Sequence, residues 1–448
     1  MLDKIIKAYD IRGLVKNEVT TDFSFALGVA YAKFLEIERE PATIVVGEDM
    51  RDSSAPLADA FSDGATSQGM DVIRIGLAST DMLYFASGKL NLPGIMFTAS
   101  HNPAQYNGMK LCKSGAKPIG QESGLLTIKQ LIQEGIAISN RPVGSIRKMD
   151  LLDDYVTYLI DRFPKKTFKK RKLKVVIDAG NGMAGFTAPS VMKKLNVELI
   201  PMYFDLDGDF PNHEANPIEP KNLEDLQKRV KKEKADLGLA FDGDADRCFL
   251  VDENADLVNP SSLTALIAVR ELKRNPGASI IYNLISSKAV PEIILENGGK
   301  PVRSRVGHSY IKSLMAQTGA VFGGEHSGHF YFADFWRADS GMLAALYALA
   351  ELMDSPKSLS KILESFDRYF SSGEINTQVK DASKSIKLVR KKYENENEID
   401  ELDGLTVSSQ KWWFNLRPSN TEPLLRLNVE ADSPKLMAEI RDTVLSLI

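Results

Sequence analysis

The sequence predicts an α/β protein of four domains, in which three similar mixed-sheet α/β units precede a smaller C-terminal α+β domain. Short apolar runs typical of buried strands alternate with segments of helical periodicity as far as about residue 369. This alternation favours sheets with helices on both faces. The chain has 448 residues, which is too long for one hydrophobic core.

Changes in pattern place the domain boundaries, and we expect domains over 1–146, 147–252, 253–369 and 370–448. Helices are expected over 21–38, 54–69, 150–163, 287–297, 308–318 and 340–353. Strands are expected over 43–47, 72–75, 94–97, 237–241, 248–251 and 279–284, with another beginning at Lys174. A loop carrying Asn107, Gly108 and Lys110 is expected before the end of the first domain. Asn259 and Pro260 are typical of the N-cap and first position of a helix. In the last domain, strands near 411–414 and 425–429 precede a C-terminal helix, and 393–403 is expected at the surface.

Composition excludes several function classes. The net charge of −4 gives no electrostatic reason to expect nucleic acid or an anionic membrane as a partner. Two cysteines, Cys112 and Cys248, cannot form a disulfide framework and fit a reducing compartment. The N-terminus lacks the apolar region of a signal peptide, and no apolar run approaches the length of about 18 residues that spans a bilayer. We therefore expect a cytoplasmic protein.

Two further segments each allow a functional and a structural interpretation. The basic run 165–172 has the composition of a nucleic-acid patch, but the acidic balance of the chain favours a solvated linker. The turn at 178–182 resembles a glycine-rich phosphate loop with loose spacing, and a structural turn accounts for it equally well.

The first candidate site is the segment Thr98-Ala99-Ser100-His101-Asn102-Pro103. It follows the apolar run 94–97, and Asn102-Pro103 breaks the backbone because the residue before proline avoids the helical region. Ser100 and His101 are therefore expected at the carboxyl end of a strand, where open α/β sheets bind ligands. A serine–histidine pair taken alone is much more typical of an ordinary turn without function, and the other candidate loops are what shift that balance.

The second candidate site is the acidic loop Asp242-Gly243-Asp244-Ala245-Asp246-Arg247 between two apolar strands. Alternating carboxylates on a loop converge on one hard cation, and three of them leave room for a phosphate oxygen, as Mg²⁺ prefers. An EF-hand is the competing interpretation, but Glu253, at the offset of its bidentate ligand, lies beyond an apolar strand. A solvated acidic turn is the structural alternative.

Two further loops are rich in polar donors. Gly324-Glu325-His326-Ser327-Gly328-His329 offers side chains suited to sugar hydroxyls, and 417–423 combines a guanidinium, hydroxyls and an amide in the manner of a phosphate site. Four of the five histidines fall in the candidate loops or at Gly307-His308-Ser309, without the spacing of zinc ligands.

In this order along the chain, the four loops resemble the α-D-phosphohexomutase family, specifically its phosphomannomutase/phosphoglucomutase branch. The resemblance covers essentially the whole chain and implies that family's four-domain arrangement. It implies that Ser100 is a phosphoserine that donates and recovers a phosphoryl group. It also implies that Asp242, Asp244 and Asp246, with an oxygen of that phosphoserine, bind Mg²⁺.

The resemblance assigns further residues by their positions in the family motifs. Around the reacting groups it places Arg12, His101, Lys110, Arg247, His308 and His329. For binding the sugar phosphate it implies Tyr9, Glu325 and Ser327, with the latter two at O3 and O4, and for the distal phosphate Arg417, Ser419, Asn420, Thr421 and Arg426. It leaves open whether Lys110 or His308 is the general base. His326 and Ile285 depart from residues common in the family, although Lys288 lies near the latter.

The implied activity is interconversion of hexose 1-phosphate and hexose 6-phosphate, with mannose or glucose as the sugar and hexose 1,6-bisphosphate as intermediate and activator. Such an isomerase has small sugar phosphates as partners and is expected as a monomer or weak homodimer. Alternatives are a phosphoglucosamine mutase, a metal-dependent sugar-phosphate phosphatase and a sugar-phosphate-binding protein without catalysis.

Overall fold

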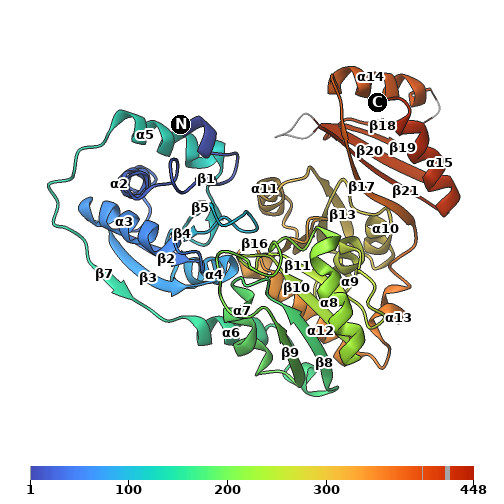
Figure 1. Ribbon diagram of the computed structural model, residues 1–448, viewed down its shortest axis with the longest axis horizontal. Helices are drawn as coiled ribbons and strands as arrows, with labels where there is room; N and C mark the ends of the chain where they lie inside the picture. Colours follow the sequence, from blue (N-terminus) through green and yellow to red (C-terminus); the bar gives the residue numbers. More distant parts are fainter. Residues whose placement is uncertain (1, 396, 419–423) are drawn as a thin grey trace. The chain divides into compact units, whose positions relative to one another are not determined.

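The computed structural model describes residues 2–395, 397–418 and 424–448 (Figure 1). The chain divides into two compact units, each described below by itself. Unit 1 comprises Met1–Val258 with Ser327–Ser360, and unit 2 comprises Asn259–His326 with Lys361–Ile448. Within the described part of the chain, no helix has both the length and the apolar character needed to cross a membrane.

The first sheet of unit 1 is mixed, with strand order β1-β5-β4-β2-β3-β7 and β6 paired to β5. Strands β4, β2, β3 and β7 run parallel, while β1 and β5 run antiparallel to their neighbours. The strands are β1 (Ile11–Leu14), β2 (Thr43–Glu48), β3 (Asp71–Leu77), β4 (Gly94–Phe97), β5 (Tyr106–Lys113), β6 (Lys117–Pro118) and β7 (Ile146–Lys148). The helices are α1 (Leu2–Ile5), α2 (Thr21–Ile37), α3 (Ser54–Ser67), α4 (Thr80–Leu90) and α5 (Leu126–Glu134), with a π-helical turn at Gln121–Leu125.

One expectation for this sheet is wrong. The segment with Asn107, Gly108 and Lys110, taken from the sequence as a loop, is part of strand β5. Gly108 is needed because strand β1 passes so closely that a Cβ atom would lie 2.3 Å from the carbonyl oxygen of Ile11. The Asn-Gly pair therefore marks a close approach of two strands rather than a turn.

The second sheet of unit 1 has the order β11-β10-β8-β9, with β11 antiparallel to three parallel strands. Its strands are β8 (Leu173–Asp178), β9 (Val197–Met202), β10 (Leu237–Phe241) and β11 (Cys248–Val251). The accompanying helices are α6 (Leu152–Asp161), α7 (Ala184–Met192) and α8 (Glu224–Glu233), with 3₁₀ turns at Thr167–Lys169 and Pro220–Leu223. Unit 1 also contains the antiparallel pair β15 (Phe330–Phe332) and β16 (Ala338–Asp339), a 3₁₀ turn at Ala333–Phe335, and α12 (Gly341–Asp354).

The structure adds to the interpretation of two segments in this region. The basic run is not a plain linker, because Thr167 and Phe168 are buried and the Phe168 ring lies 4.9 Å from that of Phe163. The glycine-containing turn is structural, because its amides are already used. The Gly180 amide donates to Asp178, and that of Asn181 donates to a backbone carbonyl at 2.8 Å.

The α/β part of unit 2 contains three parallel strands in the order β13-β12-β14. They are β12 (Ser279–Asn283), β13 (Lys300–Ser304) and β14 (Phe322–Gly324), and the helices are α9 (Pro260–Arg274), α10 (Ala289–Glu296) and α11 (His308–Thr318). Helix α13 (Leu359–Leu363) follows later in the chain. The predicted start of α9 is confirmed, because the Asn259 side chain accepts a hydrogen bond from the Ser261 amide.

The C-terminal domain is an antiparallel sheet of order β17-β21-β20-β19-β18 with helices α14 and α15 (Figure 1). The elements are β17 (Phe370–Gln378), α14 (Ala382–Tyr393), β18 (Glu398–Asp400), β19 (Leu405–Ser408), β20 (Trp412–Pro418), β21 (Leu424–Ala431) and α15 (Pro434–Leu445). Alternate residues of the sheet form an apolar core with both helices. The segment 393–403 is not only surface, since it supplies edge strand β18. Three α/β units and this domain confirm the predicted fold class.

Candidate active site

Ser100 lies where the sequence predicts, just beyond the end of strand β4. Its backbone has φ = +52°, a left-handed conformation that is uncommon for any residue except glycine. The loop holds this conformation through the Thr98 hydroxyl, which accepts from the Ser100 amide at 2.9 Å. A fixed backbone of this kind aims the Ser100 side chain in one direction.

Arg51 holds the same loop from the carboxyl end of strand β2. Its guanidinium donates to the carbonyl oxygens of Ser100 at 2.9 Å and Asn102 at 2.6 Å, and to those of Pro103 and Tyr106 at 3.0 and 3.1 Å. Burial lowers the pKa of Arg51, and the adjacent Asp49 carboxylate opposes that effect. Sequence analysis missed Arg51. The available signal was its position after a parallel strand next to β4.

The Ser100 hydroxyl points at the acidic loop between β10 and β11. Its Oγ donates to Asp242 Oδ2 at 2.8 Å and lies 3.2 Å from His101 Nδ1. The two loops approach so closely that a Cβ atom on Gly243 would lie 2.3 Å from the Ser100 carbonyl oxygen. Only glycine fits at that position without displacing the serine loop.

The three aspartates of the acidic loop form one cluster. Asp242, Asp244 and Asp246 are buried, and each offers an oxygen within 4.8 Å of the others. Burial raises the pKa of Asp242 to about 7, against the opposing charge of Arg247. Among the described residues, Asp244 Oδ1 and Asp246 Oδ1 have no hydrogen-bond partner. Three buried hard oxygen ligands, two of them unsatisfied, fit a divalent cation such as Mg²⁺.

Two protein cations lie against this cluster. Lys110 Nζ is 2.6 Å from both Asp244 Oδ2 and Asp246 Oδ2, and Arg247 Nε is 2.8 Å from Asp242 Oδ2. Burial works to lower the pKa of Lys110, but the two carboxylates outweigh it and hold that pKa well above its ordinary value. Lys110 is therefore a charged hydrogen-bond donor in this arrangement. Thr80, which sequence analysis missed, also donates to Asp244 Oδ2 at 2.5 Å.

Arg12 and His101 complete the surroundings of Ser100. Arg12 on β1 donates to the Asn102 side chain at 2.6 Å and pairs with Asp10 at 2.5 Å. Burial holds the pKa of His101 well below its ordinary value, and the charges of Arg247 and Arg12 act in the same direction. His101 is therefore neutral beside the serine. Tyr9 lies in the turn before β1 and is half-buried.

Ser327 and His329 join the same group within unit 1. The His329 backbone forms an isolated antiparallel bridge with Arg247, and His329 Nε2 lies 3.6 Å from Asp246 Oδ1. The Ser327 hydroxyl is 3.0 Å from His329 Nδ1. The structure thus brings seven predicted residues around the acidic cluster, besides the three aspartates. They are Ser100, His101, Arg12, Lys110, Arg247, Ser327 and His329.

The remaining predicted residues belong to unit 2. Glu325 is buried, and its Oε1 accepts from the Gly307 amide at 3.0 Å, just before α11. Arg417 and Arg426 both pair with Glu374, which sequence analysis missed. Ser419, Asn420 and Thr421 lie outside the described residues, as does the side chain of His308.

The two residues that depart from the family pattern also lie in unit 2. Burial lowers the pKa of His326, the Glu374 charge opposes that effect and the Arg417 charge adds to it. Ile285 is buried and lines a small cavity together with polar residues that include His326 and Glu430. Lys288, at the start of α10, donates from Nζ to the Gln410 carbonyl oxygen at 3.0 Å. The Lys288 ammonium therefore binds a backbone carbonyl of the C-terminal domain.

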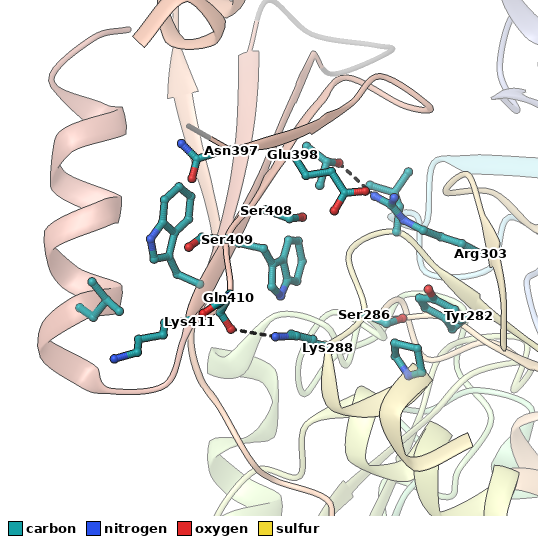
Figure 2. Close-up of a pocket in the computed structure, with 16 residues that line it drawn as sticks. Tyr282, Ser286, Lys288, Arg303, Asn397, Glu398, Ser408, Ser409, Gln410 and Lys411 are labelled. Atoms are coloured by element: carbon teal, nitrogen blue, oxygen red, sulfur yellow. Dashed lines mark hydrogen bonds between the residues drawn. The ribbon is translucent and has the colours of Figure 1, made fainter. Parts of the chain in front are cut away.

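A pocket of about 950 Å³ opens in unit 2 beside Lys288 (Figure 2). Tyr282, Arg303 and Trp412 line it, together with the turn between β19 and β20. Two of its cations are already engaged, because Lys288 donates to Gln410 and Arg303 pairs with Asp400 and donates to Thr406 Oγ1 at 3.1 Å. Of the predicted substrate-binding and catalytic residues that the structure describes, none lines this pocket.

Comparison with known domain families matches four successive segments of the chain. Four domain families match: the phosphoglucomutase/phosphomannomutase alpha/beta/alpha domains I, II and III over residues 3–137, 153–255 and 259–369, and the C-terminal domain over 374–447. The chain is 40% identical to a phosphomannomutase of Vibrio cholerae, over 95% of this chain and 94% of the relative. It is 38% identical to one of Methanocaldococcus jannaschii, over 99% and 97%.

Solved structures agree. The crystal structure of a phosphoglucomutase/phosphomannomutase family protein from Burkholderia thailandensis superposes with a TM-score of 0.90 at 32% identity, covering 99% of this chain and 96% of that one. The chain therefore belongs to the phosphoglucomutase/phosphomannomutase family and is a mutase, an enzyme that transfers a phosphoryl group within one molecule.

Proposed function

We propose that this mutase interconverts hexose 1-phosphate and hexose 6-phosphate through a phosphorylated Ser100, with mannose or glucose as the sugar. The observation that carries the proposal is the 2.8 Å contact of Ser100 Oγ with Asp242, at the edge of a buried acidic cluster. The names of relatives of this chain, phosphomannomutase and phosphohexose mutase, support this choice of substrate.

A phosphoryl group on Ser100 carries about −1.5 to −2 charges near neutral pH. Beside three carboxylates this charge needs compensation, and Arg247 and Lys110 supply part of it. Asp242, Asp244 and Asp246 would hold Mg²⁺, which would neutralise charge on the transferring group. This role suits phosphoryl transfer, in which positioning and electrostatic stabilisation lower most of the barrier.

In the proposed reaction a sugar hydroxyl attacks the phosphorus of phosphoserine. The bond from phosphorus to Ser100 Oγ breaks, a bond to the sugar oxygen forms, and the hydroxyl proton passes to a general base. Of the two candidates, His308 is proposed for this role, because Lys110 is already protonated between Asp244 and Asp246. The product is hexose 1,6-bisphosphate. After this intermediate turns end for end, Ser100 Oγ attacks its other phosphate, which restores phosphoserine and releases the isomerised sugar phosphate.

Substrate binding is assigned to the two remaining loops. Glu325 and Ser327 would contact O3 and O4 of the sugar, and Arg417 and Arg426, with Ser419, Asn420 and Thr421, would bind the phosphate that is not reacting. A guanidinium offers paired donors that match a phosphate, which suits this role.

The test compares Ser100→Ala with Ser383→Ala, a matched change of an exposed serine on α14. Ser100→Ala should keep its circular dichroism spectrum and lose several orders of magnitude in turnover of mannose 1-phosphate and glucose 1-phosphate. Ser383→Ala should match wild type. Near-normal turnover of Ser100→Ala would exclude Ser100 as the phosphoryl carrier.

A further inference from the structure

The two arginines assigned to the distal phosphate lie directly opposite each other in the C-terminal sheet. Arg417 on β20 is in register with Arg426 on β21, and directly opposed residues of an antiparallel pair share one face. The neighbouring apolar residues Leu416, Leu425 and Leu427 face the helices, so the arginines lie on the polar face. Like charges directly opposite each other destabilise a sheet.

Glu374 on strand β17 offsets one of these two positive charges. Its Oε2 lies 2.9 Å from Arg417 Nη2, and its Oε1 lies 3.2 Å from Arg426 Nη1, so that one carboxylate bridges both guanidinium groups. The three side chains are only 26%, 9% and 31% exposed, in the order Glu374, Arg417 and Arg426. Solvent therefore screens the three charges only in part.

The bridge leaves donors unused. Arg417 Nε and Arg426 Nε are buried and have no hydrogen-bond partner among the described residues. Buried donors without a partner are costly. Glu374 therefore satisfies only some of the guanidinium donors, as expected of an anion site that could bind a larger anion than one carboxylate.

We propose that Glu374 is a positioning residue that acts as an internal counter-ion of the distal phosphate site and competes with the substrate phosphate for Arg417 and Arg426. This inference rests on the proposed function, in which the two arginines bind that phosphate. Without substrate, Glu374 keeps the guanidinium groups close together. When a phosphate of two negative charges arrives, Glu374 becomes a like charge beside it and weakens its binding.

Weaker binding has a use in the proposed reaction. The bisphosphate intermediate must leave this site with one phosphate and return with the other, so a site that holds phosphate too tightly slows the exchange. The Glu374 carboxylate can take over the guanidinium donors as the phosphate departs. Glu374 thereby lowers the cost of release without touching the reacting atoms.

The experiment measures binding of inorganic phosphate and glucose 6-phosphate by calorimetry to wild type, Glu374→Gln and Glu374→Ala. Removing the Glu374 charge should tighten phosphate binding about tenfold in both variants. The phosphate then no longer has to displace a charge-assisted hydrogen bond between Glu374 and the arginines. The melting temperature without ligand should fall, since the arginines lose their counter-ion. In turnover, KM and kcat should fall together as release becomes limiting.

Two controls separate the possible outcomes. Glu401→Gln removes a glutamate that pairs with Arg390 at 2.9 Å elsewhere in the same domain, and it should leave phosphate binding unchanged. In an Arg417→Ala background, the effect of Glu374→Gln should shrink to the part that acts through Arg426. If Arg417→Ala binds phosphate as wild type does, the proposed phosphate site itself is wrong. If Arg417→Ala weakens binding but both Glu374 variants bind as wild type or more weakly, Glu374 is only a structural support and this inference is overturned.

Discussion

Replacing Arg51 with methionine should release the loop that carries Ser100. The Arg51 side chain is 2% exposed, donates to four carbonyl oxygens of that loop and neighbouring β5, and pairs with Asp49, whose side chain has no exposure. Methionine keeps much of the volume but leaves Asp49 as a buried carboxylate without its cation. Breaking a buried pair of this kind costs about 3–5 kcal/mol.

The loss should be local, because the carbonyls that Arg51 binds all lie between Ser100 and Tyr106. Hydrogen exchange followed by mass spectrometry should show reduced protection in peptides covering 98–106, with peptides of the C-terminal domain unchanged. Activity should fall about 100-fold, since displacing a reacting group by about 1 Å has an effect of that size.

A second substitution tests the physical reason. Asp49→Asn combined with Arg51→Met removes the unpaired charge and should recover part of the stability, but not the activity, because the loop carbonyls still lack their donor. The reasoning is refuted if Arg51→Met shows wild-type exchange in 98–106 together with wild-type turnover. Arg51→Lys, which keeps the charge but cannot match the planar set of donors, should be intermediate.

Three further outcomes are expected. Asp244→Asn removes one charge from the acidic cluster, so calorimetry should show Mg²⁺ binding weakened at least tenfold. Saturating substrate should not restore turnover. If this variant binds Mg²⁺ with wild-type affinity, the ion binds elsewhere. Burial acts to lower the pKa of His213, but its hydrogen bond to Asp178 at 3.0 Å outweighs this and raises that pKa. The charged pair therefore stabilises the fold fully below the unfolded pKa of about 6.5, and this stabilisation is lost as pH rises through the folded pKa. In urea denaturation, His213→Gln should lower the free energy of unfolding more at about pH 6 than at about pH 9. An equal loss at both pH values would contradict the assignment. Because the proposed contacts of Glu325 and Ser327 are to O3 and O4, mannose and glucose phosphates, which differ at C2, should agree within about 10³ in kcat/KM; a larger ratio requires a buried polar contact at C2.

The features that were predicted best from the sequence are those that a local pattern of residues determines. Strands such as β4 and β10 are uninterrupted apolar runs, and the loops after them carry their chemistry in consecutive residues, so Ser100 and the three aspartates could be found without a structure. Strand β5 was missed because Asn107-Gly108 has the composition of a turn, while the reason for its glycine is the passage of β1, nearly a hundred residues earlier.

Residues that act through distant contacts left no local motif. Thr80 reaches Asp244 across 164 residues, and Glu374 reaches Arg417 across 43. Both stand in short polar runs, 79–81 and 371–378, but neither run has a spacing or composition that indicates a particular chemistry. Contacts of this kind depend on strand register and on which loops lie next to each other. Both are properties of the assembled sheets rather than of any short segment.

A single-turnover experiment on phosphorylated enzyme tests the account most directly. Enzyme phosphorylated by hexose 1,6-bisphosphate and freed of ligand is mixed with mannose 6-phosphate, and both protein mass and small-molecule products are followed. The account predicts that the protein loses one phosphoryl group, mapped to Ser100, while an equal amount of mannose 1,6-bisphosphate appears. Release of the group as inorganic phosphate, or its location on a residue other than Ser100, would contradict the proposed mechanism.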